Sequence, residues 1–171
     1  MRIFLIGFMG CGKSYIGKRV AKHLGVSFID LDDYLEKKEN RTIKKIFEEE
    51  GEDYFRRKEE ECLLEMEQYE NVIIATGGGA PCFFDNSDWM NKNGIAVYLK
   101  TPIELIYEQL KRGKEKRPLV QRLSDEELKD FIQKKLEERS PFYENVHIIY
   151  ERQEGDEAVK ELINYFSMFH K

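Results

Sequence analysis

The most constraining feature of this sequence is a glycine-rich octapeptide near its start. Residues 7–14 read Gly-Phe-Met-Gly-Cys-Gly-Lys-Ser and match the pattern G-x-x-x-x-G-K-[ST] at every position. The apolar run Arg2–Ile6 precedes the octapeptide, and Ile16, Val20 and Leu24 follow it at helical spacing. A strand, a glycine turn and a helix in this order are typical of a P-loop NTPase. The octapeptide therefore predicts a nucleotide site within an α/β domain.

The residue types in this loop are those that phosphate binding requires. Glycines allow the backbone to curl until several N–H groups converge on one anion, and the following helix directs its positive end to the same point. We expect Lys13 to reach the β- and γ-phosphates and the Ser14 hydroxyl to bind Mg²⁺. A G protein would also need an N-K-x-D and a D-x-x-G sequence. The chain contains neither, which favours a kinase.

Short β-rich runs alternate with helical patterns along the rest of the chain. We predict strands at residues 2–6, 26–30, 71–75, 95–99 and 146–150. Their alternation with helices predicts a parallel sheet with both faces covered. No internal repeat or linker interrupts the pattern, so a single domain over residues 1–171 is the simplest interpretation.

Two capping boxes predict where helices begin. Thr101 is followed by a proline and Glu104, and Ser124 is followed by Glu127. Apolar residues recur at helical spacing after each box. We expect the second of these helices to end at Ser140, because a proline follows it.

Composition excludes several classes of protein. The net charge is −5, which disfavours a general nucleic-acid binder. No apolar run approaches the roughly 20 residues that a membrane span needs, and the first one is too short for a signal peptide. The three cysteines form no metal-ligand spacing and favour a reducing compartment. We therefore expect a cytoplasmic protein without a membrane or nucleic-acid partner.

Two acidic residues follow the second predicted strand. Residues two apart in an extended segment project to the same side, so Asp30 and Asp32 would both face the carboxyl edge of the sheet, where α/β proteins bind ligands. One carboxylate could then organise a metal and the other could meet a substrate hydroxyl. The alternative is that Asp32 or Asp33 caps the next helix.

Three glycines, residues 77–79, follow the third predicted strand. Adjacent glycines are entropically costly, so they indicate close approach of the backbone to a ligand, or alternatively a tight turn. Arg139 lies on the apolar stripe of its predicted helix, and Arg56 and Arg57 begin another helical segment. Arginines and exposed N–H groups together would suit a small hydroxylated carboxylate, although a lone arginine is more often at the surface.

The stretch 111–117 holds five basic residues in a chain of net negative charge. We interpret the segment from about residue 111 to 123 as a lid that closes over ATP, with a solvated basic loop as the alternative. Gly113 is expected to end the helix before it.

Together these motifs resemble the shikimate kinase family over nearly the whole chain. The resemblance is carried by the P-loop, by Asp-Leu-Asp at 30–32, by the segment ending in Phe-Arg-Arg at 55–57, by the glycine triplet, by Arg-Pro-Leu at 117–119 and by Arg-Ser-Pro-Phe-Tyr at 139–143. It implies a nucleoside-monophosphate-kinase-like fold with a five-stranded parallel sheet. It also implies ATP-dependent phosphorylation of the shikimate 3-hydroxyl, on the route to chorismate and the aromatic amino acids.

The resemblance also implies roles for individual residues. It implies that the substrate is contacted by Asp32, Arg56, Gly78 and Arg139. It implies catalytic roles for Lys13, for Asp32 as candidate base, and for Arg117, and Mg²⁺ binding by Ser14 and Asp30. The residues that it implies contact the nucleotide are Gly10, Cys11, Gly12, Lys13, Ser14, Tyr15, Arg112, Arg117 and Arg152.

Two kinds of departure from the family pattern stand out. Cys11 and Tyr15 replace residues that are commonly Ser, Ala or Thr, and we expect activity to be retained because the backbone does the binding there. The loop at 151–155 lacks the proline of many relatives, which leaves Gln153 as an alternative to Arg152 beside the adenine. We expect a monomer. The competing hypotheses are a gluconate kinase and a catalytically silent nucleotide-binding protein.

Overall fold

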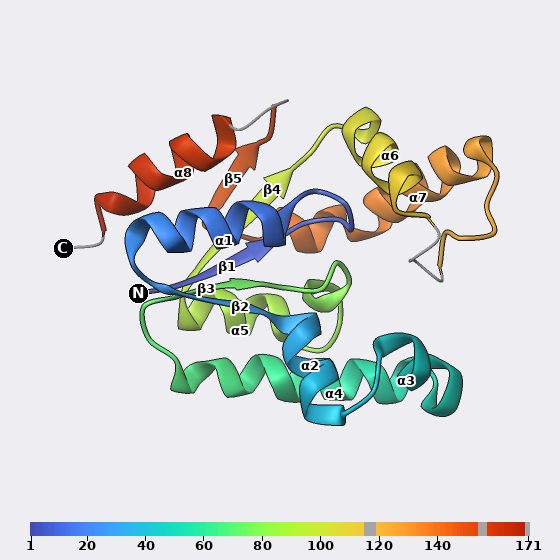
Figure 1. Cartoon of the computed structure of the whole chain (residues 1–171), viewed down its shortest axis with the longest axis horizontal. Coiled ribbons are helices and arrows are strands. Elements are labelled where there is room, and N and C mark those ends of the chain that lie inside the picture. The colour runs from blue at the N-terminus through green and yellow to red at the C-terminus, as the bar shows by residue number, and fades with distance from the viewer. Residues whose placement is uncertain (115–118, 154–156, 170–171) are drawn as a thin grey trace.

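The computed structural model describes residues 1–114, 119–153 and 157–169. Its centre is a five-stranded sheet in the order β2-β3-β1-β4-β5, and every neighbouring pair is parallel (Figure 1). All five predicted strands are confirmed to within one or two residues at each end. The strands are β1 (Arg2–Ile6), β2 (Ser27–Asp30), β3 (Val72–Ala75), β4 (Ile95–Lys100) and β5 (Ile148–Glu151).

Helices cover both faces of this sheet. One face carries α1 (Lys13–Leu24) and α8 (Glu157–Ser167), which lie side by side in Figure 1. The helices of the other face and of the adjoining lobe are α2 (Leu31–Glu39), α3 (Ile43–Glu50), α4 (Glu52–Leu64), α5 (Asn86–Asn93), α6 (Ile103–Arg112) and α7 (Asp125–Tyr143). Two 3₁₀ turns, η1 (Glu65–Gln68) and η2 (Ala80–Cys82), flank β3.

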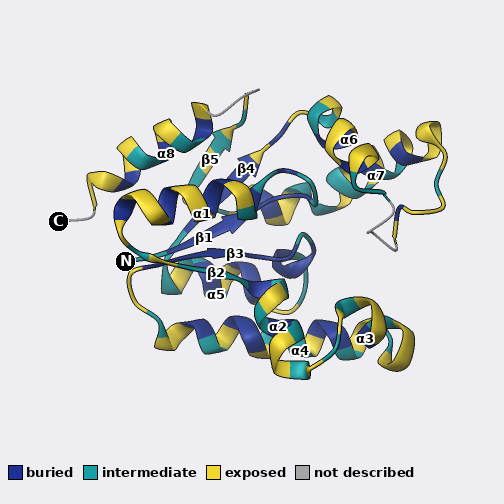
Figure 2. Ribbon diagram, in the orientation of Figure 1, coloured by how far each residue is buried: buried dark blue, intermediate teal, exposed yellow. Residues whose placement is uncertain are grey.

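The central strands divide their side chains between two hydrophobic cores. Ile3 and Leu5 of β1 pack with α1 and α8, whereas Phe4 and Ile6 pack with the helices on the opposite face. Because successive residues of a strand point to opposite faces, a sheet covered on both sides requires apolar residues at every position. The burial pattern in Figure 2 follows this rule, since β1, β3 and β4 are buried almost throughout.

Only one of the two predicted capping boxes exists. The Ser124 hydroxyl accepts from the Glu127 N–H at 3.2 Å, and the Glu127 carboxylate accepts from the Ser124 N–H at 2.7 Å. The prediction at Thr101 is wrong, because α6 begins at Ile103 and Pro102 precedes it in an extended conformation. The Thr101 hydroxyl donates to the Leu99 carbonyl, and no side chain caps the start of α6.

The predicted end of α7 at Ser140 is also wrong. The helix continues through Pro141 to Tyr143, and the Glu144 N–H still donates to the Ser140 carbonyl at 2.9 Å. A proline removes one helical hydrogen bond and usually ends or kinks a helix. Here the residue after next, Tyr143, is fully buried and bonded to another segment, which holds the last turn in place. Gly113 ends α6 as predicted.

Candidate functional site

The predicted phosphate-binding loop joins β1 to α1 at the carboxyl edge of the sheet. Gly10 and Gly12 have φ angles of 78° and 89°, which side chains disfavour, so glycine is needed at both positions. Lys13 is buried, and its ammonium donates to the carbonyls of Gly7 at 2.7 Å and Phe8 at 3.0 Å. A bound phosphate would therefore compete with two loop carbonyls for this ammonium.

The other predicted nucleotide contacts divide into those near the loop and those away from it. Cys11 is fully buried, so only its backbone faces a ligand, and Tyr15 is exposed on α1. The Arg152 guanidinium donates to the Cys11 carbonyl at 2.5 Å and lies 2.8 Å from where a Cβ on Gly12 would be. Arg152 is thus packed on the P-loop, and its contact with the adenine stays a prediction.

A cavity of about 590 Å³ lies beside this arginine. Both Arg152 and its sequence alternative Gln153 line it, together with Thr101 just after β4 and Ser140 on α7. Arg112 is exposed at the end of α6 and is not among the lining residues. The structure therefore brings Arg152, and not Arg112, to the cavity.

The Asp30 carboxylate connects the P-loop to α2. One of its oxygens accepts from the Ser14 hydroxyl, and the other accepts from the backbone N–H groups of Asp32 at 3.1 Å and Asp33 at 3.4 Å. Asp30 is therefore the N-cap of α2, and Asp32 lies in the first helical turn. The prediction of one extended Asp30–Asp32 segment is wrong, and so is its alternative with Asp32 or Asp33 as the cap, because the strand ends at Asp30.

Despite this different backbone, Asp32 faces the same site as Asp30. The pKa of Asp32 is raised to about 7, mainly by burial and also by the nearby carboxylates of Glu59 and Asp30, while Lys13 opposes the rise. A carboxylate with such a pKa is close to half ionised at neutral pH and suits a proton acceptor.

The Ser14 hydroxyl and the Asp30 carboxylate are hard oxygen donors, the kind that Mg²⁺ prefers. Among the described residues, no group of three or more His, Cys, Asp or Glu side chains could hold a metal on its own. A pair of oxygens is nevertheless sufficient for Mg²⁺ in a kinase, because phosphates and water complete its coordination.

The glycine triplet lies where side chains from distant segments crowd its backbone. A Cβ on Gly77 would lie 2.5 Å from a carboxylate oxygen of Glu59 and 3.1 Å from one of Asp32. A Cβ on Gly78 would lie 3.4 Å from the Arg139 guanidinium. The Ala80 N–H donates to the Gly77 carbonyl at 3.2 Å, so the segment forms the tight turn that was the alternative interpretation, while close approach to a ligand stays a prediction.

Arg56 fills the space beside the third glycine of the triplet. Its guanidinium lies 2.6 Å from where a Cβ on Gly79 would be, and it donates to Glu59 at 2.8 Å. The Phe83 ring lies under it, with its centroid 4.2 Å from the guanidinium carbon. Arg56 is buried beside the glycine triplet, whereas its neighbour Arg57 is exposed.

Glu59 is a site residue that the sequence analysis missed. Its side chain is 2% exposed, and its Oε1 has no hydrogen-bond partner among the described residues. Burial raises the pKa of Glu59, and the charges of Arg56 and Arg139 oppose this rise. A signal was present in the sequence, since Glu59 lies three residues after Arg56 and three before the buried Cys62 on one helical face.

Arg139 approaches the site from α7, whereas Arg56 comes from α4. Its guanidinium carbon lies 5.5 Å from the Phe8 ring centroid, and one nitrogen lies 3.5 Å from the Tyr143 hydroxyl. Two arginines therefore converge on the glycine triplet from different elements. This arrangement can bind a carboxylate beside the phosphate-binding loop.

The predicted lid is only partly described. Arg117 lies outside the described residues, as do residues 115, 116 and 118. On either side of them, Val120 is buried in the core with α6 and α7, and the Lys114 ammonium donates to the Leu123 carbonyl. The described parts of this segment are thus anchored to the body of the protein.

Comparisons with known proteins point to one family. A family model described as shikimate kinase matches residues 9–167. A shikimate kinase of Parabacteroides distasonis is 47% identical over 150 residues, which cover 88% of this chain and 87% of that protein.

Solved structures agree with the sequence comparisons. The crystal structure of shikimate kinase from Bacteroides thetaiotaomicron superposes with a TM-score of 0.91 at 40% identity, covering 99% of this chain and 97% of that one. Shikimate kinase from Acinetobacter baumannii in complex with shikimate gives 0.86 at 36% identity, covering 98% and 91%. A gluconokinase from Sinorhizobium meliloti shares the fold alone, with a TM-score of 0.62 at 16% identity and coverage of 99% and 93%.

Proposed function

This chain belongs to the shikimate kinase family, and from that premise we propose how its residues divide the work of phosphoryl transfer. The enzyme phosphorylates the 3-hydroxyl of shikimate with ATP as co-substrate, giving shikimate 3-phosphate on the route to chorismate and the aromatic amino acids. The fold is that of a P-loop kinase with a five-stranded parallel sheet flanked by helices.

One observation carries the assignment of the site. The phosphate-binding loop and a cup formed by Arg56, Arg139, Asp32 and Glu59 meet at the same edge of the sheet, around the glycine triplet. In the proposed complex, the two arginines hold the substrate carboxylate, and Asp32 and the backbone at Gly78 bind its hydroxyls. A hydroxylated acid held there presents an oxygen to the terminal phosphate of a nucleotide on the P-loop.

Phosphoryl transfer then follows from these positions. The oxygen of the shikimate 3-hydroxyl bonds to the γ-phosphorus, and Asp32 takes the proton of that hydroxyl. The bond between the γ-phosphorus and the bridging oxygen breaks, and this oxygen leaves with ADP. Lys13 and Arg117 stabilise the charge on the transferred group, and Arg152 with the rest of the P-loop holds the nucleotide. Mg²⁺, held by Ser14 and Asp30, would supply charge neutralisation at the phosphates.

An assay of ADP release tests the substrate and the metal together. We expect turnover with shikimate and Mg²⁺, and none with gluconate or when the metal is chelated. Turnover with gluconate but not shikimate would contradict the substrate assignment, and full activity with chelator present would contradict the metal assignment. Nucleotide binding without any phosphorylated product would indicate the catalytically silent alternative.

The role of Arg139 has its own test. We expect Arg139→Ala to weaken shikimate binding by about 2 kcal/mol, or roughly 30-fold in KM, because a desolvated carboxylate loses its charged partner. The KM for ATP should stay unchanged. Arg57→Ala is the matched control, since that arginine is exposed. Equal effects of the two substitutions on the KM for shikimate would contradict the proposal that Arg139 binds its carboxylate.

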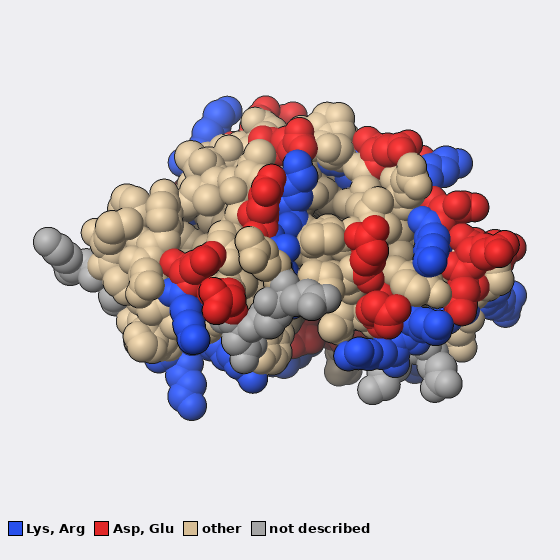
Figure 3. All heavy atoms as spheres, turned by 90° about the horizontal axis from the view of Figure 1, so that it is seen from above, with Lys and Arg blue, Asp and Glu red and all other residues tan. Residues whose placement is uncertain are grey.

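We further propose a single-domain monomer in the cytoplasm, with a lid over residues 111–123 and no nucleic-acid or membrane partner. None of the described helices is both long and apolar enough to cross a bilayer. Acidic and basic side chains are interspersed over the described part of the face in Figure 3, and the net charge is −5. Light scattering of the purified protein tests the monomer, and a dimer mass would contradict it.

A further inference from the structure

Tyr143 connects two parts of the substrate cup that lie far apart in the sequence. Its hydroxyl donates to the Gly78 carbonyl at 2.5 Å and accepts from the Arg139 guanidinium at 3.5 Å. Gly78 lies in the turn after β3, whereas Arg139 lies one helical turn before Tyr143 on α7. A single hydroxyl therefore ties the glycine triplet to one of the two arginines.

The surroundings of Tyr143 hold this hydroxyl in one place. The residue is fully buried, and its ring packs on Tyr98 with centroids 5.1 Å apart. Burial also raises the pKa of the Tyr143 hydroxyl, so it stays protonated and keeps its capacity to donate. The tyrosine stands in the last turn of α7, after Pro141, where a helix would ordinarily have ended.

The contact with Gly78 acts on more than one backbone group. The Gly78 carbonyl and the Gly79 N–H belong to the same planar peptide, so fixing the carbonyl fixes the direction of that N–H. The space beside Gly78 is also limited, because a Cβ there would lie 3.2 Å from the Met9 N–H nitrogen of the P-loop and 3.4 Å from the Arg139 guanidinium. The hydroxyl thus sets the spacing between the triplet and the arginine.

We propose that Tyr143 is a positioning residue for the acid substrate, which it serves by holding the Arg139 guanidinium and the backbone of the glycine triplet in register. The proposal rests on the substrate roles assigned above to Arg139 and Gly78. Tyr143 does not itself touch the reacting atoms. Its effect is therefore on ground-state binding of shikimate, while chemistry and nucleotide binding proceed as before.

The substitution Tyr143→Phe removes only the hydroxyl. We expect the KM for shikimate to rise roughly tenfold, with kcat within about twofold and the KM for ATP unchanged. Titration calorimetry with shikimate should show the same weakening in the absence of nucleotide. Tyr34→Phe is the matched control, because the Tyr34 hydroxyl donates to Glu65 at 2.7 Å outside the cup.

A double-mutant cycle with Arg139→Lys separates positioning from general stability. If Tyr143 acts through Arg139, the two substitutions together should cost less than the sum of their separate effects on shikimate binding. Full additivity, an unchanged shikimate KM in Tyr143→Phe, or equal increases in both KM values with a lowered Tm would overturn the proposal. If Arg139→Lys itself leaves shikimate binding unchanged, the assigned role of Arg139 fails, and the proposal fails with it.

Discussion

At the scale of single residues, Asp32 lies where its ionised form lowers the stability of the folded protein. Its carboxyl is half-buried beside Glu59 and Asp30, and desolvation and these charges raise its pKa from 3.8 to about 7. The folded protein therefore binds this proton more tightly than the unfolded chain does. Stability from this group is greatest below pH 3.8 and is lost as the pH rises toward 7, at about 1.4 kcal/mol per unit of pKa shift. A buried carboxylate kept at such a cost is typical of a catalytic site.

Asp32→Asn should consequently stabilise the protein while inactivating it. The neutral amide removes the charge penalty, so the Tm should rise at about pH 8 and change much less at about pH 4. The kcat should fall at least about 100-fold, with ATP affinity retained, because the acceptor hydroxyl loses its base. Calorimetry at both pH values and steady-state kinetics measure the two effects.

The exposed Asp33 is a control for the same turn of helix. Asp33→Asn should alter neither the pH dependence of the Tm nor the kcat. If Asp32→Asn lowered the Tm at about pH 8, the charge of Asp32 would not destabilise the folded protein at that pH. Equal losses of turnover and ATP affinity in that variant would contradict a role at the acceptor hydroxyl.

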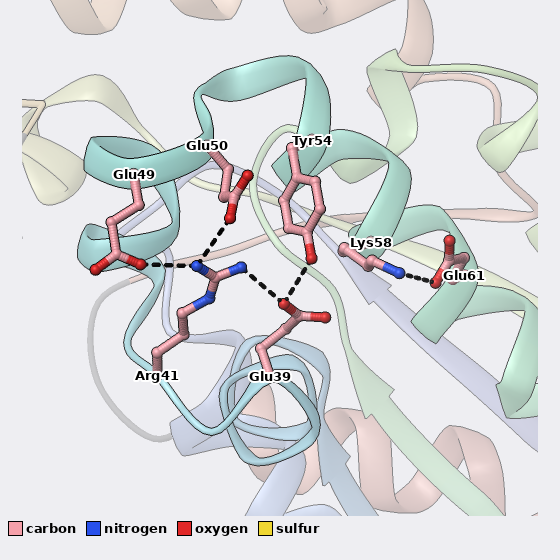
Figure 4. Close-up of polar contacts among 7 residues, drawn as sticks. All are labelled: Glu39, Arg41, Glu49, Glu50, Tyr54, Lys58 and Glu61. Atoms are coloured by element: carbon pink, nitrogen blue, oxygen red, sulfur yellow. Dashed lines mark hydrogen bonds and ion pairs between the residues drawn. The ribbon is translucent and has the colours of Figure 1, made fainter.

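At the scale of elements, Arg41 joins three helices of the lobe that carries much of the cup. Its guanidinium donates to Glu39 of α2 at 3.1 Å and to Glu49 and Glu50 of α3 at 2.7 and 3.2 Å (Figure 4). The Tyr54 hydroxyl of α4 donates to the same oxygen of Glu39 at 2.9 Å. This network fixes α2 and α4 relative to each other, and those helices carry Asp32 and Arg56.

Arg41→Gln should therefore weaken the lobe and, through it, substrate binding. Without the cation, three carboxylates face one another, so the Tm should fall, and it should fall less at high salt, which screens their repulsion. The KM for shikimate should rise while the KM for ATP stays constant, because the P-loop lies outside the lobe. Thermal unfolding at two salt concentrations and kinetics with each substrate test this.

A control for Arg41 stands in the same view. Lys58 pairs with Glu61 at 2.8 Å within one helix near the surface, an arrangement that ordinarily contributes little (Figure 4). Lys58→Gln should leave the Tm and both KM values nearly unchanged. A similar loss in the two variants would show that Arg41 acts only as one more surface charge.

Local sequence rules predicted the elements well but their ends less well. The strands and the Ser124 box follow from neighbouring residues, and both were found. The helix end predicted at Ser140 was wrong because a tertiary contact decided it, since Tyr143 bonds to Gly78, 65 positions away. A partner so distant leaves no periodic signal in the sequence. The helix start predicted at Thr101 was wrong for a local reason, because Pro102 is the N-cap and the Thr101 hydroxyl bonds to Leu99, two residues away.

At the scale of the whole molecule, the site is the carboxyl edge of the sheet, to which several loops contribute. The P-loop was predictable because all of its parts are consecutive in the sequence. Asp32 was predicted at the site from an incorrect backbone geometry, and the parallel topology brought it there all the same. Glu59 was missed although its helical spacing from Arg56 was a signal, and Tyr143 was not predicted because its bond to the Gly78 carbonyl exists only in the folded chain.

This arrangement separates two binding functions within one small domain, and the separation can be measured by ligand-induced stabilisation. A ligand at about 100 times its Kd adds about 2.7 kcal/mol to the stability of the folded state, which is several degrees in Tm. Shikimate should raise the Tm of the wild type and of Lys13→Ala, but not of Arg139→Ala. ADP with Mg²⁺ should raise the Tm of the wild type and of Arg139→Ala, but not of Lys13→Ala. Each shift is taken relative to the ligand-free Tm of the same variant, since Lys13→Ala also leaves the carbonyls of Gly7 and Phe8 without their donor. Loss of both responses in either variant would mean that the phosphate loop and the acid cup form one cooperative site instead of two adjoining ones.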